Sequence, residues 1–225
     1  MSFADKKLSE IAISIPGSTA LLREYDLDFC CGGADTLGAA VAEKNLNLAE
    51  IEARLTELQN SKKQDDEQRW LTAPYADIIE HIIHRYHERH KQQLSELFVL
   101  AELVESVHGD RDDCPIGIAA EIQNIYSDLT SHMMKEEQIL FPMIKMGNYA
   151  MARMPIQVME HEHAEHGEHL DVLKALTNNL TPPADACNTW RALYSGIQEF
   201  MDDLMMHIHT ENNILFPRVI EEGSR

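Results

Sequence analysis

The sequence predicts an all-α protein in which an up-down four-helix bundle follows a small helical N-terminal domain. Four long segments from residue 74 onward carry apolar residues at helical spacing, and short connections join them. No stretch alternates apolar and polar side chains as a half-buried strand does. All 12 histidines lie between His81 and His209, so the two parts of the chain also differ in composition.

The small helical domain is expected over residues 1–58. Pro16-Gly17 ends the first short apolar pattern, and Ser18 is expected to cap the next helix. Cys30-Cys31-Gly32-Gly33 then interrupts the pattern, and Thr36 is expected to cap the helix that follows. A segment of this size buries little apolar surface by itself.

A polar stretch at residues 59–73 is expected to link this domain to the bundle, which is expected over residues 74–221. Glycine, asparagine and proline separate the long apolar patterns, and short connections favour antiparallel neighbours. The expected helices of the bundle cover residues 75–108, 115–145, 153–178 and 184–220.

The charge balance excludes several classes of partner. The chain has 19 Lys+Arg against 38 Asp+Glu, a net charge of −19, which disfavours nucleic acids and anionic membrane surfaces. No apolar run approaches the roughly 18–20 residues that span a bilayer, and the start has no secretory pattern. Four cysteines do not make a disulfide scaffold. We therefore expect a cytoplasmic protein in a reducing compartment.

An internal repeat gives the most informative pattern. The motif H-x-x-x-E-x-x-I-L-F-P occurs at residues 132–142 and again at 207–217, with a constant offset of 75 positions. The other two long helices each carry H-x-x-H-x-x-H, at residues 84–90 and 163–169. The bundle is therefore predicted to be one helical hairpin used twice.

The repeated motif predicts a metal centre. His132 and Glu136 share one helix face, as do His207 and Glu211, and the apolar residues in phase with them point to the core. Burying such groups is costly, and metal coordination offsets that cost. One inward histidine from each remaining helix completes a set that suits two ions bridged by two carboxylates. The candidate ligands are His87, His132, Glu136, His163, His207 and Glu211.

Nitrogen and carboxylate donors without cysteine favour iron or manganese over a structural zinc–thiolate site. A single H-x-x-x-E on a helix is usually a surface pair, and it is the repetition on core stripes that favours a metal. The remaining histidines of the helix faces are expected on polar or flanking positions: His81, His84, His90, His161, His166, His169 and His209.

Several segments together resemble one known family. They read YDLDFCCGG at residues 25–33, YHERH at 86–90, SHMMKEEQILFP at 131–142 and ENNILFP at 211–217. The chain resembles the repair-of-iron-centres family of di-iron proteins, which are YtfE- or ScdA-like and carry a hemerythrin-like domain. The resemblance implies two non-haem iron ions per chain held by the six residues above, with Glu136 and Glu211 as bridges.

The resemblance also implies a function: repair of iron-sulfur clusters after nitrosative or oxidative stress, by iron donation and by binding nitric oxide. Damaged iron-sulfur proteins would be its clients. Oxygen-carrying hemerythrins have a histidine where this chain has Gly167 and an aspartate where it has Asn212. Three alternatives stay open: hemerythrin-type oxygen binding or sensing, enzymatic reduction of nitric oxide, and a purely structural metal site.

Cys30 and Cys31 are the candidate functional residues of the first domain. They are expected to form a thiol transfer pair that takes a nitrosyl group or passes iron, and the helix start at Thr36 is expected to lower a thiol pKa. The alternative is two buried small hydrophobic residues. The expected linker would let this domain reach its own bundle or pair with a second subunit as a homodimer.

Overall fold

The regular secondary structure is entirely helical in the part of the chain that the computed structural model describes, residues 2–61 and 66–224, apart from one isolated bridge between Lys7 and Thr36. The prediction of an all-α fold is therefore confirmed. The N-terminal elements are α1 (Leu8–Ser14), α2 (Ser18–Glu24), α3 (Leu37–Glu43), α4 (Leu48–Asn60) and the 3-10 helix η1 (Asp66–Leu71).

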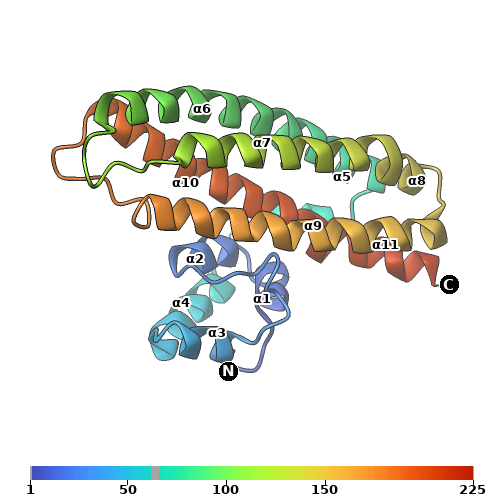
Figure 1. Ribbon diagram of the computed structural model, residues 1–225. Helices are drawn as coiled ribbons and strands as arrows, with labels where there is room; N and C mark the ends of the chain where they lie inside the picture. The colour runs from blue at the N-terminus through green and yellow to red at the C-terminus, as the bar shows by residue number, and fades with distance from the viewer. Residues whose placement is uncertain (1, 62–65, 225) are drawn as a thin grey trace.

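Four long rods follow, and Figure 1 shows them lying side by side with the small helices against one side, next to α9. Three of the rods contain a π-helical turn within otherwise regular α-helix. The rods are α5 (Tyr75–Ile82), η2 (Ile83–His87) and α6 (Glu88–His108); α7 (Ile118–Lys135), η3 (Glu136–Leu140) and α8 (Phe141–Lys145); α9 (Tyr149–Leu176); and α10 (Asn188–His209), η4 (Thr210–Leu215) and α11 (Phe216–Gly223).

The rods pack as a four-helix bundle. Helix α6 contacts α7 and α10, while α9 contacts α7 and α11, so each rod has two neighbours around a common core. The apolar stripes predicted from the sequence supply that core: Ile125, Leu129 and Phe200 are each buried. The predicted up-down architecture is confirmed.

Several helix starts differ from the prediction: α7 begins at Ile118 rather than near residue 115, and α10 begins at Asn188 rather than near residue 184. Helix α9 begins at Tyr149 rather than near residue 153 and continues through Pro155. This proline removes one backbone hydrogen bond and crowds the carbonyl of Met151, but the turns on either side keep the helix continuous. Ser18 is not a cap, since its hydroxyl donates to the carbonyl of Ile11 at 2.9 Å and Gly17 supplies the helix start at φ 78°. Thr36 does cap α3, accepting from the amide of Ala39 at 3.3 Å.

The expected linker, residues 59–73, includes the end of α4 and all of η1. Its residues 62–65 lie outside the described part of the chain. Arg218 of α11 donates to the carbonyls of Trp70 and Ala73, both at 2.8 Å, which fastens the end of this stretch to the bundle. The division of the chain into domains at residues 1–58 and 74–221 stays a prediction.

Candidate metal centre

The six predicted ligands come together in the middle of the bundle. Each is at most 1% exposed, and each of the four rods contributes at least one. The three π-turns of the rods coincide with predicted ligands: His87 ends η2, Glu136 begins η3 and Glu211 lies in η4. π-turns occur frequently at functional sites, where the extra residue per turn re-aims side chains.

One half of the centre consists of His87, His207 and one oxygen from each glutamate. The Nε2 atom of His87 lies 3.3 Å from Oε2 of Glu136 and 3.2 Å from Nε2 of His207. The Nε2 atom of His207 lies 3.3 Å from Oε1 of Glu211. These four ligand atoms all lie within 4.8 Å of one another, as the ligands of a single cation do.

The other half repeats this arrangement with His132 and His163. Their Nε2 atoms are 3.0 Å apart; that of His132 lies 3.5 Å from Oε1 of Glu136, and that of His163 lies 3.2 Å from Oε2 of Glu211. Each glutamate therefore turns one oxygen to each half. This is the arrangement of two cation sites that share two bridging carboxylates.

The buried carboxylates of Glu136 and Glu211 indicate that the centre binds cations. Both oxygens of Glu136 and both oxygens of Glu211 are buried without a hydrogen-bond partner among the described residues. A buried carboxylate whose oxygens make no hydrogen bond is strongly destabilising, and a coordinated cation removes that penalty. The donor set thus fits a pair of metal ions.

The charges of the metal-free centre are coupled. Burial and the neighbouring Glu211 raise the pKa of Glu136, but the imidazoles of His132 and His87 outweigh them and lower this pKa to about 2. Burial lowers the pKa of His132, but the Glu136 carboxylate outweighs it and raises this pKa to about 9. At neutral pH a cation must therefore displace a proton from His132.

Three of the four imidazoles are oriented by a partner at Nδ1. His87 pairs with Glu137 at 2.8 Å, His132 with Glu162 at 2.9 Å, and His163 with the amide oxygen of Asn212 at 2.8 Å. Such partners fix the tautomer that presents Nε2 to a metal. The roles of Glu137 and Glu162 were not predicted from the sequence, and Asn212 was singled out there only as a departure from the oxygen-carrier pattern.

Two further histidines near the centre are buried, and the prediction that His90 and His166 occupy polar or flanking faces is wrong. His90 packs 5.3 Å from His207 and His166 packs 4.9 Å from His132, measured between ring centroids. Each lies three residues after a predicted ligand, which places it on nearly the same helix face. This three-residue spacing from a predicted ligand is the sequence signal that could have predicted the burial of both histidines. His209 is also buried, whereas His84 and His161 are exposed as predicted.

The loop with Cys30 and Cys31 lies against the second half of the centre. The thiol of Cys31 donates to the backbone carbonyl of His163 at 3.3 Å, and that of Cys30 to Oδ1 of Asp28 at 3.2 Å. The two sulfur atoms are 3.7 Å apart, and both cysteines are free. The expected lowering of a thiol pKa is wrong for Cys30: the hydrogen bond with Cys31, burial and the Asp28 charge raise it well above its usual value.

Two asparagines of η4 hold this loop in place. Asn212 donates to the carbonyl of Cys30 at 3.1 Å, and Asn213 donates to that of Phe29 at 2.8 Å. Beside the loop lies a cavity of about 830 Å³ that both cysteines and Gly167 line. A Cβ atom added at Gly167 would meet nothing within 4 Å, so this position leaves open space where oxygen carriers have a histidine.

Comparisons with known proteins agree with this geometry. Residues 78–219 match the hemerythrin HHE cation binding domain, and residues 4–59 match ScdA_N, a domain of unknown function (DUF542). The chain is 66% identical to the "Probable iron-sulfur cluster repair protein" of Haemophilus influenzae over 99% of this chain and 100% of the relative. It is 56% identical to the "Iron-sulfur cluster repair protein YtfE" of Musicola paradisiaca, covering 98% of each chain.

The "Iron-sulfur cluster repair protein YtfE" of an Escherichia coli O81 strain is 53% identical over 98% of this chain and 99% of its own. No helix among residues 2–61 and 66–224 is long and apolar enough to cross a membrane. The bundle holds a cation-binding site of the hemerythrin type, built from buried histidine and glutamate side chains. The chain belongs to the YtfE/ScdA family of iron-sulfur cluster repair proteins.

Proposed function

We propose that this protein repairs iron-sulfur clusters damaged by nitrosative or oxidative stress, using two iron ions held between the four rods of its bundle. One observation carries the proposal: two buried groups of two histidines and two glutamates share both carboxylates. Relatives that match nearly the full length of the chain bear names that state cluster repair. Damaged iron-sulfur proteins are therefore the clients we expect.

His87 and His207 would hold one iron ion, His132 and His163 the other, and Glu136 and Glu211 would bridge them. Imidazole and carboxylate donors without thiolate suit iron. When bound, the iron pair supplies exchangeable metal and positions that accept nitric oxide. The departures from oxygen carriers at Gly167 and Asn212 support this use over reversible oxygen storage.

The surrounding residues prepare the centre. The ring of Phe141 stacks on His87 with centroids 5.8 Å apart, and that of Phe216 stacks on His163 at 6.0 Å. These rings shield the imidazoles from water and help to fix their orientation, while Glu137 and Glu162 keep Nε2 directed inward. A dry, pre-oriented set of donors binds metal without rearranging the bundle.

Cys30 and Cys31 would serve as the transfer pair, receiving iron or a nitrosyl group on its way between the centre and a client. Their sulfur atoms and an Asp28 oxygen lie within 4.8 Å of one another, close enough for one ion. The contact of Cys31 with the backbone of His163 supports the same role. Because the pKa of Cys30 is raised, the pair would release a proton as it binds.

The test is a repair assay on the full chain, purified without oxygen and analysed for metal. We expect two iron ions per chain, absorption bands of a di-iron centre that change on adding a nitric-oxide donor, and recovery of activity in a client whose [4Fe–4S] cluster nitric oxide has damaged. The double variant His132→Ala/Glu211→Ala should lose both iron and repair. Full repair by this variant without iron would overturn the proposal.

The same samples separate the alternatives. A stable, reversible oxygenated complex in air would favour oxygen binding, and sustained turnover of nitric oxide to nitrous oxide with a reductant would identify an enzyme. Zinc in place of iron without functional loss would favour a structural site. We expect none of these outcomes.

A further inference from the structure

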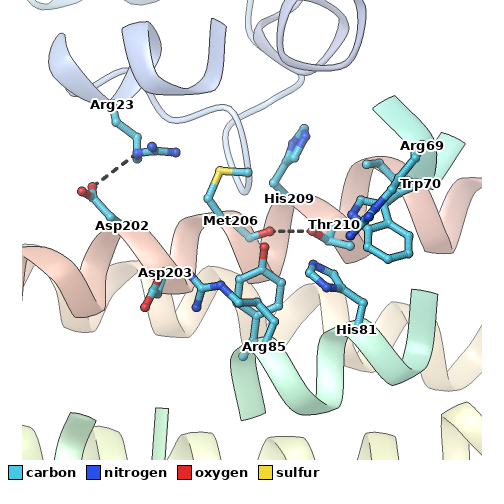
Figure 2. Close-up of a pocket in the computed structure, with 12 residues that line it drawn as sticks. Arg23, Arg69, Trp70, His81, Arg85, Asp202, Asp203, Met206, His209 and Thr210 are labelled. Carbon is cyan, nitrogen blue, oxygen red and sulfur yellow. Dashed lines mark hydrogen bonds and ion pairs between the residues drawn. The ribbon is translucent and has the colours of Figure 1, made fainter. Parts of the chain in front are cut away.

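A second cavity, distinct from the metal centre, lies where the small N-terminal helices, η1 and the bundle meet. Its volume is about 380 Å³, at the lower end of the range of small-molecule sites. Figure 2 shows that its arginines come from three separate elements: Arg23 from α2, Arg69 from η1 and Arg85 from η2. Such convergence is unusual in a chain of net charge −19.

The positive charge of this cavity is only partly neutralised. Asp202 and Asp203 are the carboxylates that line it. Asp203 is buried and already accepts from Arg85 at 2.5 Å and from Gln93 at 2.9 Å. Asp202 lies 3.4 Å from Nε of Arg23, and its side chain is 41% exposed. Three cations therefore face two carboxylates, one of which has its oxygens occupied.

Arg23 carries the most specific signal. Its Nη1 atom is buried, yet it has no hydrogen-bond partner among the described residues. A charged donor that is withdrawn from water and left unsatisfied is destabilising unless an acceptor reaches it. An oxyanion in the cavity that Arg23 lines would supply that acceptor.

The remaining wall suits a carbon skeleton. Trp70 and His81 stack with ring centroids 4.3 Å apart, and Tyr86 meets His81 edge-on at 5.4 Å. Burial lowers the pKa of His81 to about 4, so this imidazole is neutral at pH 7 and the arginines alone provide the charge. Tyr86 also stacks on the predicted ligand His207 at 5.3 Å, so this wall of the cavity adjoins the metal centre.

We propose that this cavity binds a small organic anion with two or more carboxylate or phosphate groups, held by Arg23, Arg69 and Arg85 and packed against the edge of Trp70, whose ring lies between His81 and Arg69. Bidentate hydrogen bonding of planar guanidinium groups to such oxyanions is the chemistry that this residue set provides. The occupant would touch α2, η1 and the bundle together. This site is independent of the repair activity proposed above.

Trp70 provides the readout for a binding experiment on the full, metal-loaded chain. The chain has 2 tryptophans, and the other, Trp190, is fully buried. Succinate and propane-1,3-diol bisphosphate are titrated separately at constant ionic strength, with succinamide and propane-1,3-diol as neutral controls. We expect a saturable change in fluorescence with one or both anions, which identifies the preferred group, and loss of the signal in Trp70→Phe while calorimetry still detects binding.

Two variants locate the site. Arg69→Gln, which changes an exposed side chain, and Arg23→Gln should each weaken binding at least about tenfold, the effect of one lost charge-assisted hydrogen bond. The matched control Arg153→Gln removes an exposed arginine of α9 and should leave binding unchanged. No saturable binding at about 10 mM anion, or equal weakening in the control, would overturn the proposal.

Discussion

Glu136 and Glu211 each present one oxygen to either half of the candidate centre, and each is buried without a hydrogen-bond partner among the described residues. A carboxylate is the only protein side chain that offers two equivalent anionic oxygens over such a short span. The two halves therefore depend on the same two residues, and a change at either glutamate affects both halves.

Glu211→Gln should bind at most one metal ion per chain where the unmodified protein binds two, because an amide offers a single carbonyl oxygen. In chelator-treated, metal-free protein the same change should lower the melting temperature, because it removes the buried carboxylate that pairs with the imidazoles of His163 and His207. Metal analysis and thermal unfolding measure both effects. Glu102→Gln, an exposed glutamate of α6, is the matched control. A full complement of two ions in Glu211→Gln would contradict the bridging role.

The predicted ligands could be identified from the sequence because helical periodicity and an exact internal repeat both constrain them. Their Nδ1 partners could not be identified in this way. Glu162 reaches His132 from a neighbouring rod, and the relative rotation and height of two rods are set by packing that no single helix encodes. His166 illustrates the same limit, since its burial depends on how closely α9 approaches α7.

His209 gives a pH dependence with a definite sign. Burial, and then the Arg23 charge, lower its pKa to about 4, and Asn213 donates to its Nδ1, which requires the neutral ring. An imidazole whose pKa is depressed by folding contributes stability above about pH 6.5, and this stability is lost as the pH falls toward 4. At pH 5 the loss is about 2 kcal/mol.

Chemical unfolding at pH 7 and pH 5 measures this loss. His209→Gln should reduce the difference in unfolding free energy between the two pH values by about 2 kcal/mol. His161→Gln, which removes an exposed imidazole of α9, is the control. An unchanged difference in His209→Gln would show that the folded protein accepts a proton at this position.

At the scale of elements, three of the four rods change from α- to π-helix where they carry predicted ligands. A π-turn holds one more residue than an α-turn, so the helix can re-aim side chains locally while the residues on either side keep their faces. Helical periodicity is read from a sequence with a constant number of residues per turn, so the change from α- to π-helix cannot be detected in this way. The expected bounds of the rods were nevertheless close, because one extra residue barely alters the length of the apolar pattern.

Deleting Gln138, an exposed residue of η3, should convert this π-turn to regular α-helix. We expect an unchanged helical circular dichroism spectrum, metal-free stability equal to or above that of the parent, and metal affinity at least about tenfold lower because the Glu136 carboxylate is displaced. Competition with a chromogenic chelator measures the affinity. Deletion of Asp112 in the loop between α6 and α7 is the control. Unaltered affinity after removal of Gln138 would show that the π-turn is not needed for binding.

At the scale of the whole molecule, the small N-terminal helices dock on the bundle through polar contacts at the cysteine loop. Lys174 of α9 pairs with Asp26 at 2.6 Å, and Asn212 and Asn213 of η4 donate to the loop carbonyls. The sequence indicates two parts of different composition, but their mutual placement depends on single hydrogen bonds between residues about 150 or more positions apart, which no local pattern encodes.

Asn213→Ala should loosen the docked loop without affecting the predicted ligands. The substitution removes the part-buried hydrogen bonds of Asn213 to the carbonyl of Phe29 and to His209. Losing the bond to Phe29, about 1–2 kcal/mol, should raise the rate at which a thiol reagent modifies Cys30 and Cys31 about 5- to 30-fold. Stopped-flow labelling of the full chain measures this rate, with Asn124→Ala, an exposed residue of α7, as the control. Equal rates in both variants would mean that the loop is held by its other contacts alone.

The side-chain amide of Asn212 has a mechanical consequence for the protein. Its nitrogen donates a hydrogen bond to the carbonyl of Cys30, and its oxygen, fixed in the same rigid plane, accepts one from Nδ1 of His163. Because both atoms belong to one planar amide group, a rotation of this group that breaks the hydrogen bond to Cys30 also moves the oxygen away from the His163 imidazole. Any displacement of the cysteine loop is therefore coupled, through Asn212, to the orientation of the buried His163 imidazole.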